Sequence, residues 1–296
     1  MSIFKGSGVA IVTPMKNDPE MSVNFDKLEE LIEYHIKNGT DSIIIAGTTG
    51  ESSTLTMEEH RAVIKAAVGF TRGRIPVVAG TGSNCTKTAI QLTKEAEEDG
   101  ADAALIVTPY YNKSTQAGLI RHYSMIADET RLPIIIYNVP GRTGCNVFPE
   151  TVCELVKTKE NIVGLKEATG NMAQASKTMA LLDGNLEMYS GEDGLVTPLL
   201  SIGAIGVISV LANIAPKETH DLCQKFFDGD VKGSADIQLK AIPLVDALFC
   251  EVNPIPVKKA LDIMGMEVGP VRPPLIEMSE KNTEVLKKEM KTFGIL

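Results

Sequence analysis

Short, almost continuously apolar runs recur along the chain, and segments with helical periodicity separate them. The eight runs are GVAIVT (8–13), SIIIAG (42–47), PVVAGT (76–81), AALIVTP (103–109), PIIIYNV (133–139), IVGLKEA (162–168), LEMYSG (186–191) and IGVISV (205–210). Runs without polar alternation indicate strands that are covered on both faces, as in a parallel sheet. We therefore expect eight buried parallel strands.

The segments between these runs have the apolar spacing of amphipathic helices. In residues 25–39 one apolar stripe precedes a terminal glycine, and its members are Leu28, Leu31, Ile32, His35 and Ile36. Thr56 and Glu59 have the spacing of a capping box at the start of the next helix. Residues 86–100 again end in a glycine that would stop a helix.

Eight strand–helix units predict an α/β fold, a (β/α)8 TIM barrel over residues 1–229, because such barrels usually need about 250 residues. The segment between the seventh and eighth runs is short, so its helix must be brief. A doubly wound open sheet is the alternative. The strand pattern stops after residue 229, and residues 230–296 predict a C-terminal appendix of three helices.

A lysine interrupts the sixth run, GLKEATG (164–170), where the pattern calls for an apolar residue. Alternation places Gly164 and Lys166 on one face of the strand and Val163 and Leu165 on the other. If the lysine faces the barrel interior, Gly164 would leave room one layer below it, and confinement would lower the lysine pKa.

A confined lysine could act as a nucleophile. A pKa drop of about 3 units from a reference of about 10.4 leaves about a quarter of the amine neutral at pH 7. A neutral amine attacks a carbonyl carbon to form a Schiff base. The alternative is that Lys166 extends to solvent and pairs with a carboxylate.

The residues that follow the strands are unusually polar. They are Thr13-Pro14, residues 47–51, residues 108–111, residues 137–142, Lys166 and residues 190–192. A barrel gathers the carboxyl ends of its strands on one rim, where active sites are built. The sequence therefore predicts a pocket with hydroxyls, phenols, one lysine and one arginine.

Composition and charge exclude several other classes. The net charge of −9 argues against a nucleic-acid partner. No apolar run approaches the roughly 20 residues of a membrane span, and the N-terminus lacks a secretory pattern, so we expect a cytoplasmic protein. The five cysteines and four histidines are dispersed, so neither disulfides nor a metal site is predicted.

Seven motifs occur in an order typical of one enzyme family. They are GTTGESSTL (47–55), PVVAGTG (76–82), VTPYYNK (107–113), IIYNVPGRTG (135–144), GLKEATG (164–170), SGEDG (190–194) and GVISV (206–210). Together they resemble the pyruvate-dependent class I aldolase family, which includes dihydrodipicolinate synthases and N-acetylneuraminate lyases. The resemblance spans nearly the whole chain, the C-terminal helices included.

The resemblance implies roles for particular residues. Lys166 would form the Schiff base with pyruvate, and Tyr137 would shuttle protons. Thr49 and Tyr111 would orient Tyr137, with Tyr111 supplied by the neighbouring subunit of a homo-oligomer. The family is usually a tetramer built from two tight dimers.

The resemblance also implies a set of substrate contacts. Thr48 and Thr49 would bind the pyruvate carboxylate through hydroxyl and amide donors. Gly191 and Ile208 would shape the pocket, and Arg142 would bind the carboxylate of L-aspartate-4-semialdehyde bidentately. The implied reaction is that of a 4-hydroxy-tetrahydrodipicolinate synthase in the diaminopimelate and lysine pathway, with no cofactor or metal.

Two other functions compete with this interpretation. One is cleavage of sialic acid or a 2-keto-3-deoxy sugar acid by a related aldolase; the arginine of the GRTG pattern favours the semialdehyde instead. The other is a barrel that binds a keto acid as a regulator without catalysis. The sequence argues against a site that has lost its activity, because it contains Lys166, Tyr137, Thr49 and Tyr111.

Many members of the family bind lysine as an inhibitor between two subunits. The corresponding residues here are Ser52, Ser53, His60, Asn84 and Tyr110. Met57 stands where a histidine is usual, and Thr88 where a glutamate is usual. A lysine ammonium without that carboxylate loses a partner worth about 1.5–3 kcal/mol, and Lys87 would add repulsion if it faces the site. We therefore expect weak inhibition by lysine or none.

Overall fold

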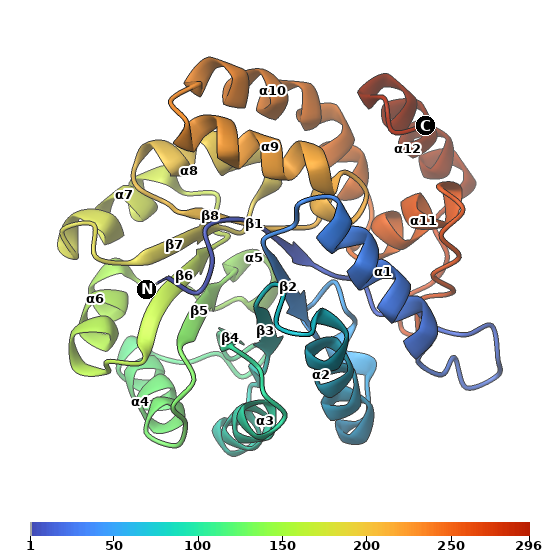
Figure 1. Ribbon diagram of the computed structural model, residues 1–296. Helices are drawn as coiled ribbons and strands as arrows, with labels where there is room; N and C mark the ends of the chain where they lie inside the picture. The colour runs from blue at the N-terminus through green and yellow to red at the C-terminus, as the bar shows by residue number, and fades with distance from the viewer. Residues whose placement is uncertain (1) are drawn as a thin grey trace.

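The computed structural model describes residues 2–296 and contains a closed barrel of eight parallel strands in sequence order (Figure 1). The strands are β1 (Gly6–Ala10), β2 (Ser42–Ile45), β3 (Val77–Gly80), β4 (Ala103–Val107), β5 (Ile134–Asn138), β6 (Ile162–Glu167), β7 (Glu187–Ser190) and β8 (Gly206–Ser209). Strand β8 pairs with β1 and closes the ring. The predicted TIM barrel is confirmed, and the open-sheet alternative is wrong.

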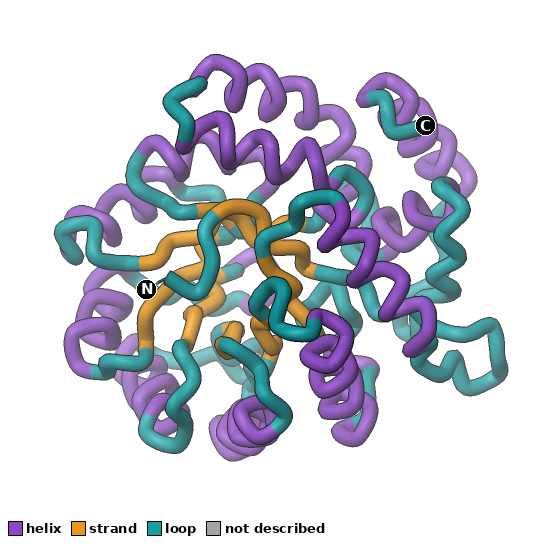
Figure 2. The backbone as a smooth tube through the Cα atoms, in the orientation of Figure 1, coloured by secondary structure: helices purple, strands orange, loops and turns teal. Residues whose placement is uncertain are grey.

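Helices surround the barrel on its outside (Figure 2). They are α1 (Phe25–Lys37), α2 (Met57–Thr71), α3 (Thr86–Glu98), α4 (Gln116–Ala127), α6 (Pro149–Thr158), α7 (Met172–Leu181), α8 (Val196–Ser201) and α9 (Pro216–Phe227). The four-residue helix α5 (Pro140–Thr143) directly follows β5 and lies near the middle of the ring in Figure 1. The brief helix expected before β8 is α8, which has 6 residues. The capping box at Thr56 and Glu59 is present, with both reciprocal bonds formed.

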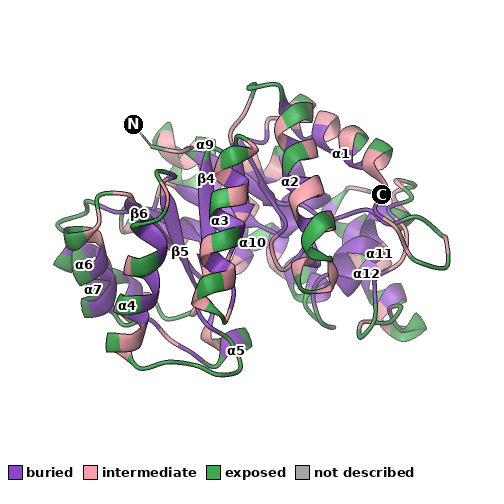
Figure 3. Ribbon diagram, turned by 90° about the horizontal axis from the view of Figure 1, so that it is seen from below, coloured by how far each residue is buried: buried purple, intermediate pink, exposed green. Residues whose placement is uncertain are grey.

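Alternation along the strands divides the apolar residues into two cores. One core fills the layer between the strands and the helices, and all but the partly exposed Ile36 of the predicted α1 stripe is buried. The other core lies inside the barrel and is formed by Phe4, Ala10, Ile44, Val78, Ala103, Leu105, Ile135, Tyr137, Val139, Ala168, Tyr189 and Ile208. Figure 3 shows this burial along the strands.

The strands are shorter than the apolar runs at their carboxyl ends. The first run extends to residue 13, but β1 ends at Ala10. Beyond the ladder, Thr13 donates a 2.7 Å hydrogen bond from its hydroxyl to the carbonyl of Gly50. The last residues of these runs therefore build the rim rather than the sheet.

Phe4 fills the barrel interior near the start of β1. Its ring stacks on Tyr189 with centroids 4.3 Å apart, and the Tyr189 hydroxyl donates to the Phe4 carbonyl at 2.9 Å. Tyr189 is fully buried. Large side chains thus occupy this end, and open space is left at the carboxyl ends of the strands.

Three helices follow the barrel, as predicted: α10 (Val231–Leu248), α11 (Ile255–Ile263) and α12 (Glu280–Phe293). Helix α10 packs along α9 and α12, and α11 packs against α12 (Figure 1). None of the helices in residues 2–296 combines the length and apolar character needed to cross a membrane.

Candidate active site

Lys166 and Tyr137 occupy paired positions on the neighbouring strands β6 and β5. The Lys166 side chain is buried in the barrel interior, and its Nζ lies 4.2 Å from the centre of the Tyr137 ring. Leu165 belongs to the outer core, so the predicted alternation is confirmed. Lys166 therefore does not reach out to solvent.

Gly164 has a different role from the expected one. A Cβ atom at this position would lie 2.9 Å from the carbonyl oxygen of Glu187 and 3.3 Å from Ile135 Cγ1. Neighbouring strands thus already fill the space that the sequence analysis assigned to the lysine. The glycine instead permits close strand contact next to a shift in the β5–β6 register, which passes over Val163.

Burial controls the protonation of Lys166. It lowers the pKa of Lys166 to about 8; Asp193 and Glu192 oppose this fall, and Arg142 adds to it. About one amine in eleven is then neutral at pH 7, fewer than the quarter expected. The predicted direction and cause of the shift are nevertheless the same.

Asp193 is a buried carboxylate that the sequence analysis did not assign, although it belongs to the SGEDG motif. Its side chain accepts hydrogen bonds from the hydroxyl of Ser209 and from the backbone N–H groups of Val210 and Leu211, the last two at 3.0 and 2.9 Å. Burial raises the pKa of Asp193, and these bonds and Lys166 partly offset the rise. Three hydrogen bonds thereby hold the Asp193 carboxyl group in one place near the lysine.

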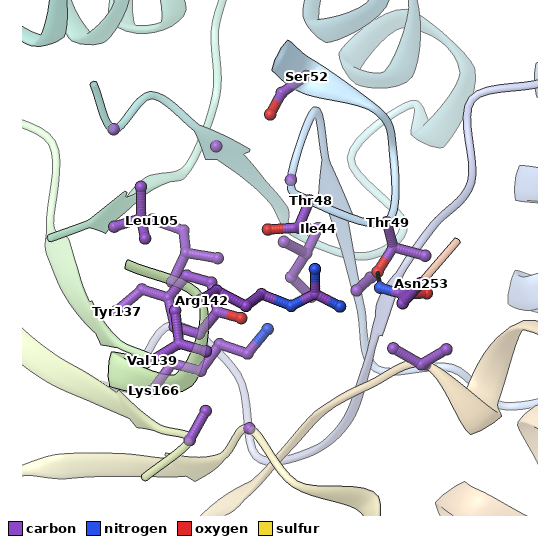
Figure 4. Close-up of a pocket in the computed structure, with 18 of the residues that line it drawn as sticks. Ile44, Thr48, Thr49, Ser52, Leu105, Tyr137, Val139, Arg142, Lys166 and Asn253 are labelled. Carbon is purple, nitrogen blue, oxygen red and sulfur yellow. Dashed lines mark hydrogen bonds between the residues drawn. The ribbon is translucent and has the colours of Figure 1, made fainter. Parts of the chain in front are cut away.

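The phenol of Tyr137 has Thr48, not Thr49, as its hydroxyl neighbour. Burial raises the pKa of Tyr137 to about 12, and Arg142 and a hydrogen bond with Thr48 partly offset the rise. The Thr49 hydroxyl instead accepts a 3.0 Å bond from Asn253 Nδ2. The two threonine side chains leave the loop in different directions (Figure 4), so Thr48 is the better candidate for the role that the resemblance assigned to Thr49.

Arg142 follows β5 in the short helix α5. Figure 4 shows its guanidinium pointing into the cavity that contains the Lys166 amine, with Thr48 and Thr49 on the facing wall. The Thr143 hydroxyl donates a 3.2 Å hydrogen bond to the Val139 carbonyl, which stabilises this helix. Arg142 is solvent-exposed, so a carboxylate could approach it from the mouth of the cavity.

The two remaining predicted contacts of the pocket differ in position. Gly191 lines the cavity, and a Cβ there would lie 2.6 Å from Ala168 Cβ and 3.1 Å from Lys166 Cε. Only glycine therefore leaves Lys166 its present position. Ile208 is buried in the interior core and is not among the residues that line the cavity.

Tyr111 does not line the cavity of its own chain. Its side chain is 92% exposed, and its φ of +70° is in the left-handed region. Packing within its own chain does not explain an aromatic side chain this exposed in a backbone conformation unfavourable for a non-glycine residue.

Most residues of the expected effector site line a second cavity. It is lined by Ser52, Ser53, His60 and Tyr110 together with Met57 and Thr88. Ser52, Thr48 and Arg142 are among the residues that also line the first cavity. Asn84 lies at Tyr110, whose carbonyl accepts a 3.2 Å bond from Asn84 Nδ2. The two replaced positions thus face the space that an effector would occupy.

His60 is fixed in this second cavity. Its Nε2 lies 2.9 Å from the Gly80 carbonyl, and burial lowers the pKa of the ring. The ring is therefore neutral at pH 7, and its Nε2–H donates a hydrogen bond to the Gly80 carbonyl rather than offering a positive charge.

Comparison with known proteins decides the family. A model of the dihydrodipicolinate synthetase family matches residues 3–293. The chain belongs to this family. It is 57% identical to the 4-hydroxy-tetrahydrodipicolinate synthase of Lachnoclostridium phytofermentans over the full length of both chains.

Solved structures of family members have the same fold. The chloride-inhibited dihydrodipicolinate synthase of Acinetobacter baumannii, complexed with pyruvate, is 48% identical over 99% of both chains, with a TM-score of 0.95. A Cyanidioschyzon merolae enzyme with lysine bound is 38% identical over all of both chains, with a TM-score of 0.96. Members of this family are lyase-type synthases of the class I aldolase group.

Asn253 is another residue that the sequence analysis did not assign. It precedes α11, is separated from Thr49 by 204 positions, and lines the cavity from the C-terminal appendix. No pattern in the sequence connects positions so far apart. Within residues 2–296 no cluster of three or more His, Cys, Asp or Glu residues could hold a metal.

Proposed function

We propose that the protein condenses pyruvate with L-aspartate-4-semialdehyde and forms 4-hydroxy-tetrahydrodipicolinate, with Lys166 as the covalent residue. The observation that carries this proposal is the buried Lys166 amine with its lowered pKa, which shares one cavity with the Arg142 guanidinium. The amine suits a 2-oxo acid, and the fork of Arg142 suits the carboxylate of a second substrate.

The first half of the reaction joins pyruvate to the protein. The neutral Lys166 amine attacks the keto carbon, the carbonyl oxygen leaves as water, and an imine remains. Loss of a methyl proton converts the imine to an enamine. Tyr137 carries protons in these steps, with Thr48 as its hydroxyl neighbour, while Thr48 and Thr49 hold the pyruvate carboxylate.

The second half forms the carbon–carbon bond. The enamine carbon attacks the aldehyde carbon of the semialdehyde, whose carboxylate Arg142 binds. The substrate amine then attacks the imine carbon, closes the ring and releases the Lys166 amine. Gly191 and Ile208 shape the pocket around these steps, as the family resemblance implies.

The active unit in this proposal is an oligomer, a homotetramer built from two dimers. Tyr111 would complete the site of the neighbouring subunit, where its phenol would join Tyr137 and Thr48. Mixing a Lys166→Ala variant with a Tyr111→Phe variant tests this: hybrid dimers should regain turnover, because one of their two sites has both residues. Failure of exchanged hybrids to regain turnover would contradict the shared site.

The proposal extends to regulation, location and chain organisation. The second cavity, with Met57 and Thr88 in place of a histidine and a glutamate, should bind free lysine weakly or not at all. We propose a cytoplasmic location and a division into a catalytic barrel (1–229) and a helical domain (230–296).

Substrate competition tests the choice of reaction. Turnover of pyruvate with aspartate semialdehyde should exceed cleavage of N-acetylneuraminate and of 2-keto-3-deoxy sugar acids under matched conditions. Faster cleavage of a sugar acid would assign the protein to another branch of the aldolases. Pyruvate binding without any turnover would indicate a regulator.

A further inference from the structure

The loop that presents Thr48 and Thr49 is bonded to the C-terminal appendix at two of its residues, Thr49 and Glu51. It follows β2 and runs from Ala46 to Glu51, and both of these residues have a φ of +54°. Two non-glycine residues in the left-handed region are strained, and such a conformation persists only where the surroundings over-determine it.

The Glu51 carboxylate makes some of the contacts that fix this backbone conformation. Its Oε1 accepts a 2.8 Å bond from Lys258 Nζ in α11, and its Oε2 accepts a 2.8 Å bond from the backbone N–H of Arg272. The side chains of Lys258 and Glu51 are only 3% and 1% exposed. Both carboxylate oxygens therefore accept hydrogen bonds, and both donors are more than 200 positions away from Glu51 in the sequence.

Lys258, the cation of this ion pair, also has hydrogen-bond acceptors for its ammonium group. Besides Glu51, its ammonium donates to the carbonyls of Thr13 at 3.2 Å and Pro270 at 2.5 Å. Thr13 in turn donates its hydroxyl to Gly50 in the loop. One ammonium thus joins the rim of β1, the loop after β2 and the segment that follows α11.

Asn253 is a second attachment and touches the loop at Thr49. Its Nδ2 donates to Thr49 Oγ1 at 3.0 Å, while its Oδ1 is buried and has no partner in the described structure. The Thr49 hydroxyl is thereby held in one orientation on the wall of the cavity (Figure 4).

We infer that Lys258 and Asn253 are positioning residues, which hold the Thr48–Thr49 loop in the conformation that binds the carboxylate of the 2-oxo acid. A fully buried ion pair usually adds little stability over an apolar replacement. The role we assign to the Lys258–Glu51 pair is therefore to fix the loop conformation rather than to add net stability. This inference rests on the proposed function, because it concerns pyruvate binding at Thr48 and Thr49. In this inference the C-terminal appendix contributes residues that position the binding site.

Steady-state kinetics and melting temperatures of variants separate positioning from simple stabilisation. Asn253→Ala should raise the pyruvate KM several-fold with little change in melting temperature. Lys258→Met should lower the melting temperature, since it strands the Glu51 charge, and should lower kcat/KM for pyruvate about 10- to 100-fold, as displaced binding groups do.

The double variant Glu51→Gln/Lys258→Met is the decisive one, because it removes both charges. Its melting temperature should recover most of the loss, while the pyruvate KM should stay raised because the loop is no longer fixed. Recovery of a wild-type KM along with the melting temperature would overturn the inference. Lys259→Met, which removes the neighbouring charge on α11, is the matched control and should behave as wild type.

Failure of the inference is distinguishable from failure of the proposed function. A wild-type protein that turns over pyruvate and variants with unchanged pyruvate KM would overturn only the positioning role. A wild-type protein that does not form a covalent adduct with pyruvate would overturn both.

Discussion

The amine of Lys166 lies against the face of the Tyr137 ring, 4.2 Å from its centre, because the two residues are register partners on adjacent strands. The proposed nucleophile and the proposed proton carrier are thus fixed by the sheet rather than by flexible loops. Burial shifts the pKa of the lysine down to about 8 and that of the tyrosine up to about 12. At pH 7 the tyrosine therefore holds its proton, while a fraction of the lysine has lost one.

Schiff-base formation should depend on pH through Lys166. Because only the neutral amine reacts, the rate of adduct formation with pyruvate should rise about tenfold per pH unit below 7 and level off above about 8. Rapid-quench borohydride trapping across pH 5.5 to 10 measures this. A rate that still rises tenfold per unit above pH 9 would show an unshifted lysine.

Replacement of Tyr137 by phenylalanine should slow turnover about 10²- to 10⁴-fold, since it removes the group that carries protons. The pyruvate adduct should still form on Lys166, because the amine and the carboxylate contacts remain. The comparison of kcat with the yield of trapped adduct checks this. Full activity of the variant would exclude a proton-transfer role.

The two threonines should give different kinetic effects. Thr48→Val should mainly lower kcat, since Thr48 is the hydroxyl neighbour of the Tyr137 phenol. Thr49→Val should mainly raise the pyruvate KM, because this hydroxyl faces Asn253 and not the phenol. Steady-state kinetics of both variants decides the matter, and the reverse pattern would restore the original assignment of Thr49.

Arg142 should control binding of the second substrate alone. Arg142→Lys keeps the charge but loses the planar fork, so the KM for aspartate semialdehyde should rise about 10- to 100-fold. The pyruvate KM should change little. An equal effect on both substrates would indicate that Arg142 acts on the pocket as a whole.

Free lysine should not inhibit the wild-type protein by half at submillimolar concentration. The double variant Met57→His/Thr88→Glu should become more sensitive, because it restores a carboxylate that can pair with the ammonium. Initial rates over a lysine titration measure both proteins. Submillimolar inhibition of the wild type would refute the expected loss of regulation.

The barrel could be predicted because buried parallel strands leave short, almost continuously apolar runs and the helices keep their periodicity. Lys166 stood out since it breaks such a run. Gly164 was misjudged because alternation gives a direction but not what fills the space, here the Glu187 backbone and Ile135. Thr48 and Thr49 could not be separated, because a loop has no fixed period from which to read direction.

The contribution of the C-terminal helices could not be seen in the sequence. Asn253 and Lys258 meet Thr49 and Glu51 across 204 and 207 positions. Neither pair has a local pattern, since long-range contacts depend on how complete elements pack. Asp193 was within a quoted motif, but its hydrogen bonds to the β8 rim required the closed barrel.

Covalent trapping of pyruvate tests the central claim most directly. The protein is incubated with pyruvate, reduced with borohydride, digested and mapped by mass spectrometry, with Lys166→Ala as the control. We expect one reduced adduct on the peptide that contains Lys166, and none in the control, which should also lack turnover. An unmodified Lys166 peptide, or a control that still turns over substrate, would contradict the Schiff-base mechanism.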